Sequence, residues 1–155
     1  FYFKDGILAT NEQIKKLVKV IEPHLLEFLE DLRSLEDAVR LMVPKVEDGN
    51  NIGVRIQRQA MIAILRGKVL SEGSLSMFKK YFKERADIVY DIAKWPHCED
   101  YRIGLEEFDR KYYLELCLIA RDMMDQYMII NDLIAKNLEK IKNPRSDRKK
   151  NVLHY

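Results

Sequence analysis

The polar residues that could bind a ligand or do chemistry cluster in one stretch, Pro44–Gly53 (PKVEDGNNIG). Asp48 and Asn50 begin like a calcium-binding loop, in which oxygen ligands recur at defined positions of a 12-residue segment. Ile52 occupies the fifth position, where an oxygen ligand belongs, and Gln59 occupies the twelfth, where a bidentate Glu belongs. The stretch therefore predicts a turn that presents backbone groups and short polar side chains, and not a metal site.

Other arrangements that support catalysis or cofactor binding do not occur in the sequence. The three histidines, His24, His97 and His154, are scattered, and no Glu-x-x-His pair of the kind used by di-iron bundles is found. No glycine-rich loop is followed by the Lys and Ser or Thr that bind phosphate. Cys98 beside His97 lacks the spaced partners of a zinc site. We therefore expect no enzymatic activity, no metal and no cofactor.

Strong turn signals fill the same stretch. Pro44 cannot continue a helix, because its ring removes a hydrogen-bond donor and clashes with the preceding turn. The run Asp48–Asn51 (DGNN) consists of turn formers, and Gly53 permits either a close backbone approach or a positive φ. On pattern alone the stretch is a surface connection between two helices. The alternative is a loop that presents its backbone and short polar groups to a partner.

An apolar repeat predicts a first helix from about Asn11 to Val43. Thr10 and Gln13 have the spacing of a capping box at its start. Pro23 should kink this helix and not end it, since the repeat continues in phase. The repeat alternates steps of four and three residues, as in a bundle or coiled-coil seam. Its members are Ile14, Val18, Ile21, Leu25, Phe28, Leu32, Leu35, Val39 and Met42.

A second helix is predicted from about Ile52 to Trp95, capped by Asn50 or Asn51. Two glycines interrupt its apolar pattern, so we predict one continuous helix with a weak point near Gly73, the alternative being two helices. The first part of its apolar face comprises Met61, Ile62, Leu65 and Val69. The later part comprises Leu75, Phe78, Phe82, Val89 and Ile92.

A third helix is predicted to begin with Asp100 as its N-cap and to end at Pro144. Its apolar positions step by four, four and three residues, an eleven-residue repeat that leaves a helix nearly straight. These positions are Phe108, Tyr112, Leu116, Ile119, Met123, Tyr127, Ile130, Ile134, Leu138 and Ile141.

Three helices of similar length with short links predict an all-α, antiparallel bundle of long helices. The 155 residues fit a single domain, residues 1–155, with a loop at 44–53 and a flexible tail at 144–155. No apolar run approaches the roughly 20 residues that span a bilayer, and the N-terminus has no signal-peptide pattern. Cys98 and Cys117 make no disulfide framework, so we expect reduced thiols in an intracellular compartment.

The tail differs in charge from the rest of the chain. Residues 142–150 carry five basic residues and one acid, a local net charge of +4, whereas the whole chain has a net charge of +2 and the remainder therefore −2. The last four residues, Val152, Leu153, His154 and Tyr155, are again mostly apolar. A solvated basic tail is the simplest interpretation. The functional alternative is a tether that ends in a docking peptide.

The letters PKVEDGNNIG resemble the activation loop of the 11S regulator (REG) proteasome activators. Three further segments match the family's sequence: Lys79–Arg85; Trp95–His97 with Asp100–Arg102; and Lys136–Lys142 with Pro144-Arg145. The resemblance covers roughly residues 11 to 155 and is to the family's C-terminal region, which begins at its second helix. We expect the family's first helix to precede Phe1 and to complete a four-helix bundle.

This resemblance implies an ATP-independent, non-enzymatic activator that forms a seven-membered ring on the proteasome core particle. The tail residues Val152, Leu153, His154 and Tyr155 would insert between subunits of the core's α-ring, and the free carboxylate would be the anchor. His154 does not match the hydrophobic–Tyr–any ending of ATPase-type activators. The activation loop would then open the core's gate and stimulate peptide hydrolysis. Its residues are Glu47, Asp48, Gly49, Asn50, Asn51, Ile52 and Gly53.

Two other interpretations remain open at this point. A helical-bundle scaffold or coiled-coil adaptor without a gating role would explain the heptad repeat equally well, but it requires neither the loop nor the tail. A nucleic-acid or anionic-membrane binder would rest only on the basic run Arg145–Lys150, so we expect no nucleic-acid or membrane partner. The family resemblance implies a cytoplasmic or nuclear location.

Overall fold

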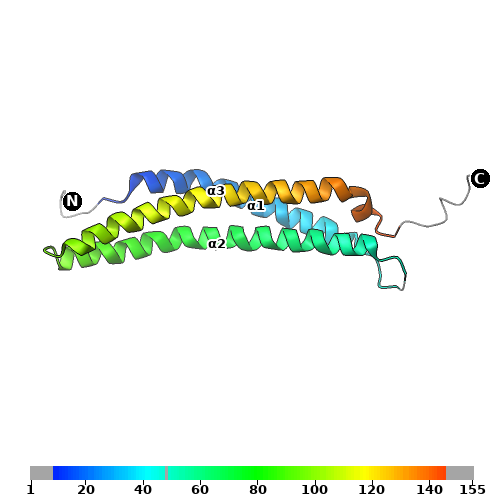
Figure 1. Ribbon diagram of the computed structural model, residues 1–155, viewed down its shortest axis with the longest axis horizontal. Coiled ribbons are helices and arrows are strands. Elements are labelled where there is room, and N and C mark those ends of the chain that lie inside the picture. The colour runs from blue at the N-terminus through cyan, green and yellow to red at the C-terminus, as the bar shows by residue number, and fades with distance from the viewer. Residues whose placement is uncertain (1–8, 48, 146–155) are drawn as a thin grey trace, which may run out of the picture. The chain divides into compact units, whose positions relative to one another are not determined.

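The structure, a computed structural model, describes residues 9–47 and 49–145. Three long α-helices make up most of this part of the chain: α1 (Glu12–Leu41), α2 (Ile52–Lys94) and α3 (Glu99–Lys142) (Figure 1). No strand occurs within the two described ranges. The prediction of an all-α fold is therefore confirmed. The helix α2 is continuous past both glycines, as predicted, and the alternative of two helices is wrong.

The chain divides into two compact units, and each contains a segment of all three helices. The first unit comprises Phe1–Glu27 with Leu70–Met123, and the second comprises Phe28–Val69 with Met124–Tyr155. Within each unit the contacts make α2 antiparallel to α1 and α3, as an up-down-up connection by short links requires. The prediction of one domain over residues 1–155 stays a prediction.

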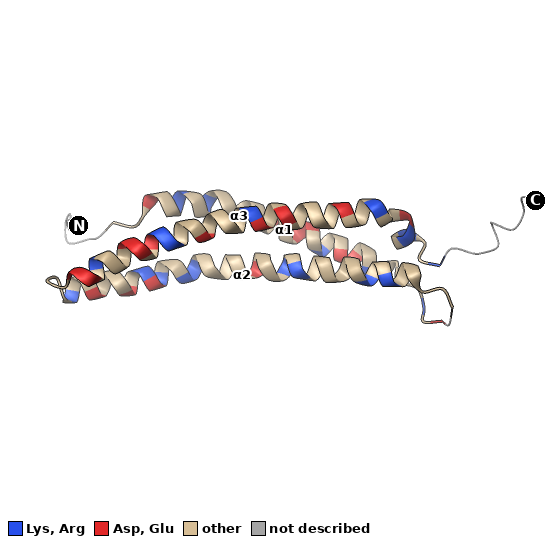
Figure 2. Cartoon of the chain, in the orientation of Figure 1, with Lys and Arg blue, Asp and Glu red and all other residues tan. Residues whose placement is uncertain are grey.

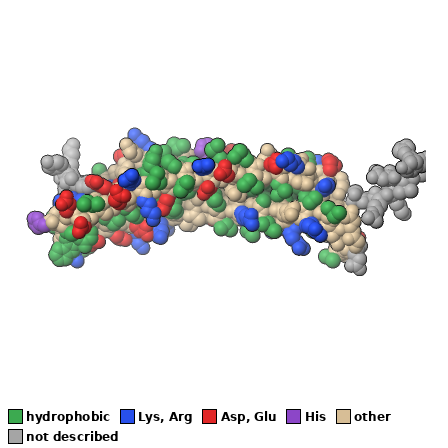
Figure 3. Space-filling model, viewed as in Figure 1, with side chains coloured by type: hydrophobic (Ala, Val, Ile, Leu, Met, Phe, Trp, Pro, Cys, Tyr) green, Lys and Arg blue, Asp and Glu red, His purple; other side chains and the backbone are tan. Residues whose placement is uncertain are grey.

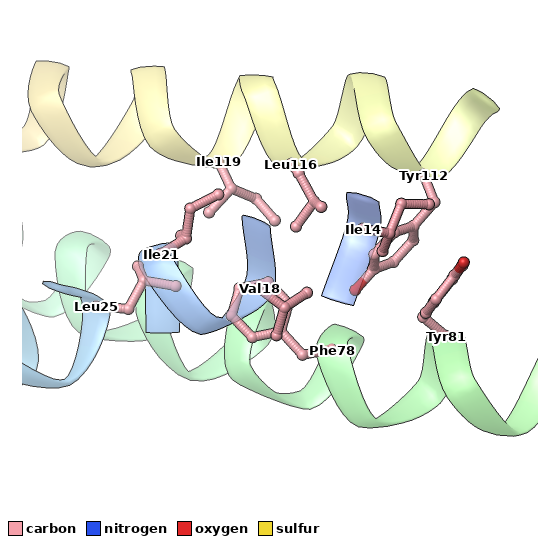
Figure 4. Packing of buried hydrophobic residues seen from close by; sticks show 9 residues of the cluster. All are labelled: Ile14, Val18, Ile21, Leu25, Phe78, Tyr81, Tyr112, Leu116 and Ile119. Atoms are coloured by element: carbon pink, nitrogen blue, oxygen red, sulfur yellow. The ribbon is translucent and has the colours of Figure 1, made fainter. Parts of the chain in front are cut away.

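The core of the first unit is built by apolar side chains from all three helices that point toward one another (Figure 4). Leu25 and Leu116 are fully buried, and the ring of Tyr81 stacks against that of Tyr112 with centroids 4.0 Å apart. Burial raises the pKa of both tyrosine hydroxyls, and for Tyr81 a hydrogen bond to Asp109 adds to the effect. The cluster comprises Ile14, Val18, Ile21, Leu25, Phe78, Tyr81, Tyr112, Leu116 and Ile119.

A polar cluster around the Asp109 carboxylate joins the three helices of the first unit. The Arg85 guanidinium donates to it at 3.1 Å and the Tyr81 hydroxyl at 2.7 Å, both from α2. The Asn11 amide donates to it at 3.0 Å from the start of α1. Arg85 is 8% exposed, so this charge is buried together with its counter-ion, as a buried charge requires.

The starts of two helices differ from the sequence predictions. Asn11, and not Thr10, caps α1, because its Oδ1 accepts the backbone N–H groups of Gln13 and Ile14 at 3.2 Å. The helix α3 begins at Glu99, so Asp100 lies in its first turn and is not the N-cap. Acidic side chains at that position still interact favourably with the helix dipole. For α2 the predicted cap is confirmed, since Asn50 Oδ1 accepts from the N–H of Ile52.

The buried face of α2 is only partly the one that its large apolar residues predicted: Phe78 and Ile92 in the later part are buried, whereas the first part of the prediction is wrong. Ile62, Leu65, Val69 and Phe82 are 46%, 57%, 62% and 38% exposed. The buried positions instead follow a heptad of small and polar residues mixed with apolar ones. From α2's first turn onward they are Gly53, Gln57, Ala60, Ile64, Gly67, Ser71, Ser74, Phe78, Tyr81, Arg85 and Ile92. Small residues at such positions allow the backbones of neighbouring helices to approach closely.

The predicted stripes of α1 and α3 are mostly confirmed. All the members from Ile14 to Leu32 are buried in α1, and so is Val39, whereas Met42 lies beyond its end and is 37% exposed. In α3, Tyr127 and Leu138 are 40% exposed, and Leu105 is a buried residue that the repeat missed. The α1 stripe is correct because large apolar residues alone fill that seam.

Gly67 and Gly73 provide a matched test of this packing. A Cβ on Gly67 would lie 2.8 Å from Cδ1 of the buried Leu32, whereas a Cβ on Gly73 would meet nothing within 4 Å. Alanine in a helix is favoured over glycine by about 1 kcal/mol, and overpacking costs about 1–3 kcal/mol. We expect Gly73→Ala to stabilise the protein by about 0.5–1 kcal/mol and Gly67→Ala to destabilise it. Urea unfolding measures both; equal gains would contradict the close packing at Gly67.

Candidate functional site

The candidate site lies in the second unit, where the link between α1 and α2 meets the end of α3 (Figure 1). The Gln57 side chain, only 1% exposed, holds these elements together. Its Nε2 donates to the carbonyl of Met42, just after α1, at 2.9 Å and to that of Ile141, near the end of α3, at 2.7 Å. One amide group thus satisfies carbonyls at two helix C-termini, which have no partner within their own helices.

The link itself has the turn geometry that its sequence predicts. Gly49 has a φ of +131°, a conformation that favours glycine. Val46, Gly49, Asn50 and Ile52 are exposed, and Val46 is fully so. The loop therefore presents short polar groups to the outside, as the sequence suggested, and also the apolar side chains of Val46 and Ile52, which the sequence analysis did not predict.

A single guanidinium contacts both arms of this loop. Arg145 Nη1 donates to Glu47 Oε2 at 2.5 Å. Its Nη2 lies 3.4 Å from the Glu47 carbonyl oxygen and 3.4 Å from Asn51 Oδ1. Arg145 directly precedes the tail, so the base of the loop and the start of the tail lie together.

The first turn of α2 packs directly on the backbone of Pro144. A Cβ on Gly53 would lie 2.2 Å from the Pro144 carbonyl oxygen, so only glycine fits there without displacing the chain. Of the two uses that the sequence suggested for Gly53, the structure has the close approach, and the positive φ belongs to Gly49.

A hollow of about 460 Å³ lies between the loop and the first turns of α2. Four cationic side chains line it and Glu47 is its one acid among the lining residues that the structure describes. The cations are Lys45, Arg55, Arg58 and Arg145. Elsewhere acidic and basic residues are mixed along the helices (Figure 2). The described residues hold no group of His, Cys, Asp or Glu side chains that could bind a metal ion.

The structure brings together most of the residues singled out from the sequence, but not all of them. Glu47 and Gly49–Gly53 lie in one loop at the α2 N-terminus. Asp48 and the tail residues Val152, Leu153, His154 and Tyr155 lie outside the described residues. Gln57 and the contacts of Arg145 were missed, because a helical glutamine and an arginine in a basic run carry no signal of what they bind.

Large apolar side chains also remain exposed along the helices (Figure 3). In the second unit, Ile62, Leu65 and Val69 form one stripe on α2, and Met124, Met128 and Ile129 are exposed on α3. No described helix has an apolar stretch of the length and hydropathy that crossing a membrane requires.

Comparison with known proteins shows the family. The sequence family described as the C-terminal region of proteasome activator PA28 matches residues 7–151. This chain belongs to the PA28 family of proteasome activators. The 11S regulator resemblance is therefore confirmed, and the family's role is regulatory.

Individual PA28 relatives agree in sequence and fold. The chain is 36% identical over 146 residues to proteasome activator complex subunit 3 of Homo sapiens, and equally to that of Gallus gallus. The match covers 94% of this chain and 58% of each relative. The solved 11S subunit of the Plasmodium falciparum proteasome, PA28, is 30% identical with a TM-score of 0.86, over 90% of this chain and 60% of that one. The chain thus spans somewhat over half the length of these PA28 proteins.

The two hydrogen bonds of the buried Gln57 amide should contribute measurably to the free energy of unfolding. Gln57→Leu leaves the Met42 and Ile141 carbonyls without their donor, and each buried polar group left unpaired costs about 1–3 kcal/mol. We expect a loss of about 2 kcal/mol in the free energy of unfolding, measured in urea. Gln59→Leu, the same change at an exposed position two residues on, should alter it by less than about 0.5 kcal/mol. Equal effects of the two changes would contradict the role of Gln57.

Proposed function

We propose that this chain is part of an ATP-independent proteasome activator subunit that has no catalytic site of its own. Its C-terminal tail docks on the α-ring of the proteasome core particle, and its loop 44–53 opens the core's gate to small peptides. The observation that carries this proposal is the contact of Arg145 with Glu47, which puts the start of the tail beside the loop. Both elements can therefore reach one partner surface.

The loop has the properties that a gate-opening element needs. Its ends are held by Gln57 and Arg145, so the exposed tip between them has a defined position. Its exposed residues include the short polar Asn50 and Asn51, and the side chain of Val46 is fully exposed. A loop fixed at both ends can displace a partner's segment with little loss of its own conformational entropy.

The tail supplies the docking group. A terminal carboxylate on a tether can pair with a lysine of the partner and accept backbone N–H bonds, which are strong charge-assisted interactions. Several weak tails on one ring bind tightly together, because each later contact is intramolecular. An activator of this kind works where proteasome cores are found, so we propose a cytoplasmic or nuclear location.

The subunits form a closed, seven-membered ring. Support comes from the exposed stripe Ile62, Leu65 and Val69 and from Trp95, which is 54% exposed. Leu17, an apolar residue outside the main repeat of α1, packs against the core of the first unit. Heterologous contacts between identical chains either close into rings or polymerise. We expect native mass spectrometry of the full-length protein to show a seven-subunit species, and a monomer at micromolar concentration would contradict the ring.

Changing the loop should separate docking from activation. Asn50→Tyr loses a weak cap at the Ile52 N–H, about 1 kcal/mol, and places a bulky ring on an exposed tip. Asn51→Tyr enlarges the same loop. We expect both variants to assemble and to co-sediment with the core as well as the parent does, but to lose stimulation of peptide hydrolysis.

Two controls accompany that experiment, one for stimulation and one for docking. His97→Tyr makes a bulky change in the other link between helices, which is exposed and lies in the first unit, and should leave stimulation unchanged. A chain without Tyr155 should fail to co-sediment with the core. Full stimulation by both loop variants would remove the loop from the mechanism, and the chain would then be better described as a helical scaffold that binds other helices.

A further inference from the structure

Arg145 bridges the two arms of the loop, on either side of its tip. Glu47 precedes Gly49, the residue with positive φ, and Asn51 follows it. The guanidinium of Arg145 donates to the Glu47 carboxylate at 2.5 Å and lies 3.4 Å from both the Glu47 carbonyl oxygen and Asn51 Oδ1. Three acceptors from the two arms therefore converge on one side chain that belongs to neither arm.

The chemistry of the guanidinium suits this arrangement. It is planar and carries five N–H donors in a fixed fork, so it can serve several acceptors whose spacing is then set by the fork. The Arg145 side chain is 23% exposed, whereas that of Glu47 is 66% exposed. An exposed ion pair by itself stabilises little, so the converging contacts matter here for position more than for overall stability.

The backbone that carries Arg145 is fixed as well. Gly53, in the first turn of α2, leaves no room for a Cβ against Pro144, so the two backbones are in direct contact. The end of α3 is anchored one turn earlier, where the Gln57 amide donates to the Ile141 carbonyl at 2.7 Å. Arg145 therefore extends from a fixed point toward the loop, and the tail begins with the next residue.

We propose that Arg145 is the positioning residue of the loop: it sets the distance between the Glu47 and Asn51 arms and couples the start of the tail to the loop. The coupling of gate opening to tail docking rests on the function proposed above, whereas the positioning of the loop does not. Docking of the tail fixes the chain at residue 145, and the guanidinium carries this constraint to the loop tip. The residue thus acts through the loop and does not itself contact the gate.

The test compares Arg145→Ala, Arg145→Gln and Arg145→Lys in the full-length protein, with Arg110→Ala as the matched control. Arg110 makes an exposed ion pair with Glu107 at 3.5 Å in the first unit, so the control removes the same side chain and charge away from the loop. Hydrogen exchange of the loop amides, above all that of Ile52, which donates to Asn50 Oδ1, reports the order of the loop in the free protein. Core binding and peptide hydrolysis at saturating activator are measured on the same samples.

We expect Arg145→Ala to speed exchange of the loop amides by about fivefold or more, the effect of losing one net hydrogen bond. Its stimulation at saturation should fall by a similar factor, while core binding stays within about twofold. Arg145→Lys should lie between Arg145→Ala and the parent, because a single ammonium keeps the ion pair but does not bridge three acceptors in a plane. Arg145→Gln should resemble alanine, and Arg110→Ala the parent.

Unchanged exchange of the loop amides in Arg145→Ala would overturn the positioning role, and so would a lysine variant as impaired as alanine. Loss of binding and stimulation together would place Arg145 in docking and overturn the coupling. If Arg145→Ala melts at a much lower temperature than Arg110→Ala, loop exchange in the folded Arg145→Lys variant decides. If the parent itself does not stimulate the core, the proposed function fails, but loop exchange in the free protein still tests the positioning.

Discussion

The arrangement of the loop end depends on one buried amide. The Gln57 amide donates one hydrogen bond to a carbonyl at the end of α1 and one to a carbonyl at the end of α3. These two bonds fix the ends of both helices relative to the first turns of α2. The side-chain amide carries two N–H donors, so it can serve two carbonyls from a buried helical position without burying a charge. The loop begins just after Met42 and the tail just after the end of α3, so both start beside a carbonyl that this amide binds. Its own Oε1 has no partner among the described residues, which is a local cost of the arrangement.

The other end of α2 uses polar chemistry in the same way. The Asp109 carboxylate accepts hydrogen bonds from Arg85, Tyr81 and Asn11. The residue that caps α1 is thus linked through Asp109 to the other two helices of the first unit. Between Gln57 and Arg85, the buried face of α2 runs through Gly67, Ser71 and Ser74. This seam leaves large apolar residues of α2, such as Leu65 and Val69, exposed.

In the second unit, too, a specific polar contact joins two helices. Lys68 on α2 donates to Glu36 on α1 at 2.6 Å, and this hydrogen bond holds the pKa of the Glu36 carboxyl below its usual range. The rings of Phe28 and Tyr127 pack at 4.2 Å nearby in the same unit. The helices are thus joined by a few specific polar contacts and ring contacts in addition to the apolar seam. This pattern leaves most charged residues free to face solvent or a partner.

The sequence by itself determined the three helices, their stops at Pro44, Pro96 and Pro144, and the turn at Gly49, because these follow from local backbone chemistry. It also determined the α1 seam, where large apolar residues alone mark the buried face, and the family, through the letters of the loop. Only the tertiary structure decided the buried face of the first half of α2 and the contacts of Gln57 and Arg145. A glycine is buried because of what lies opposite it, and a polar side chain because another element brings the carbonyl or carboxylate that it binds. Neither condition is present in the local sequence.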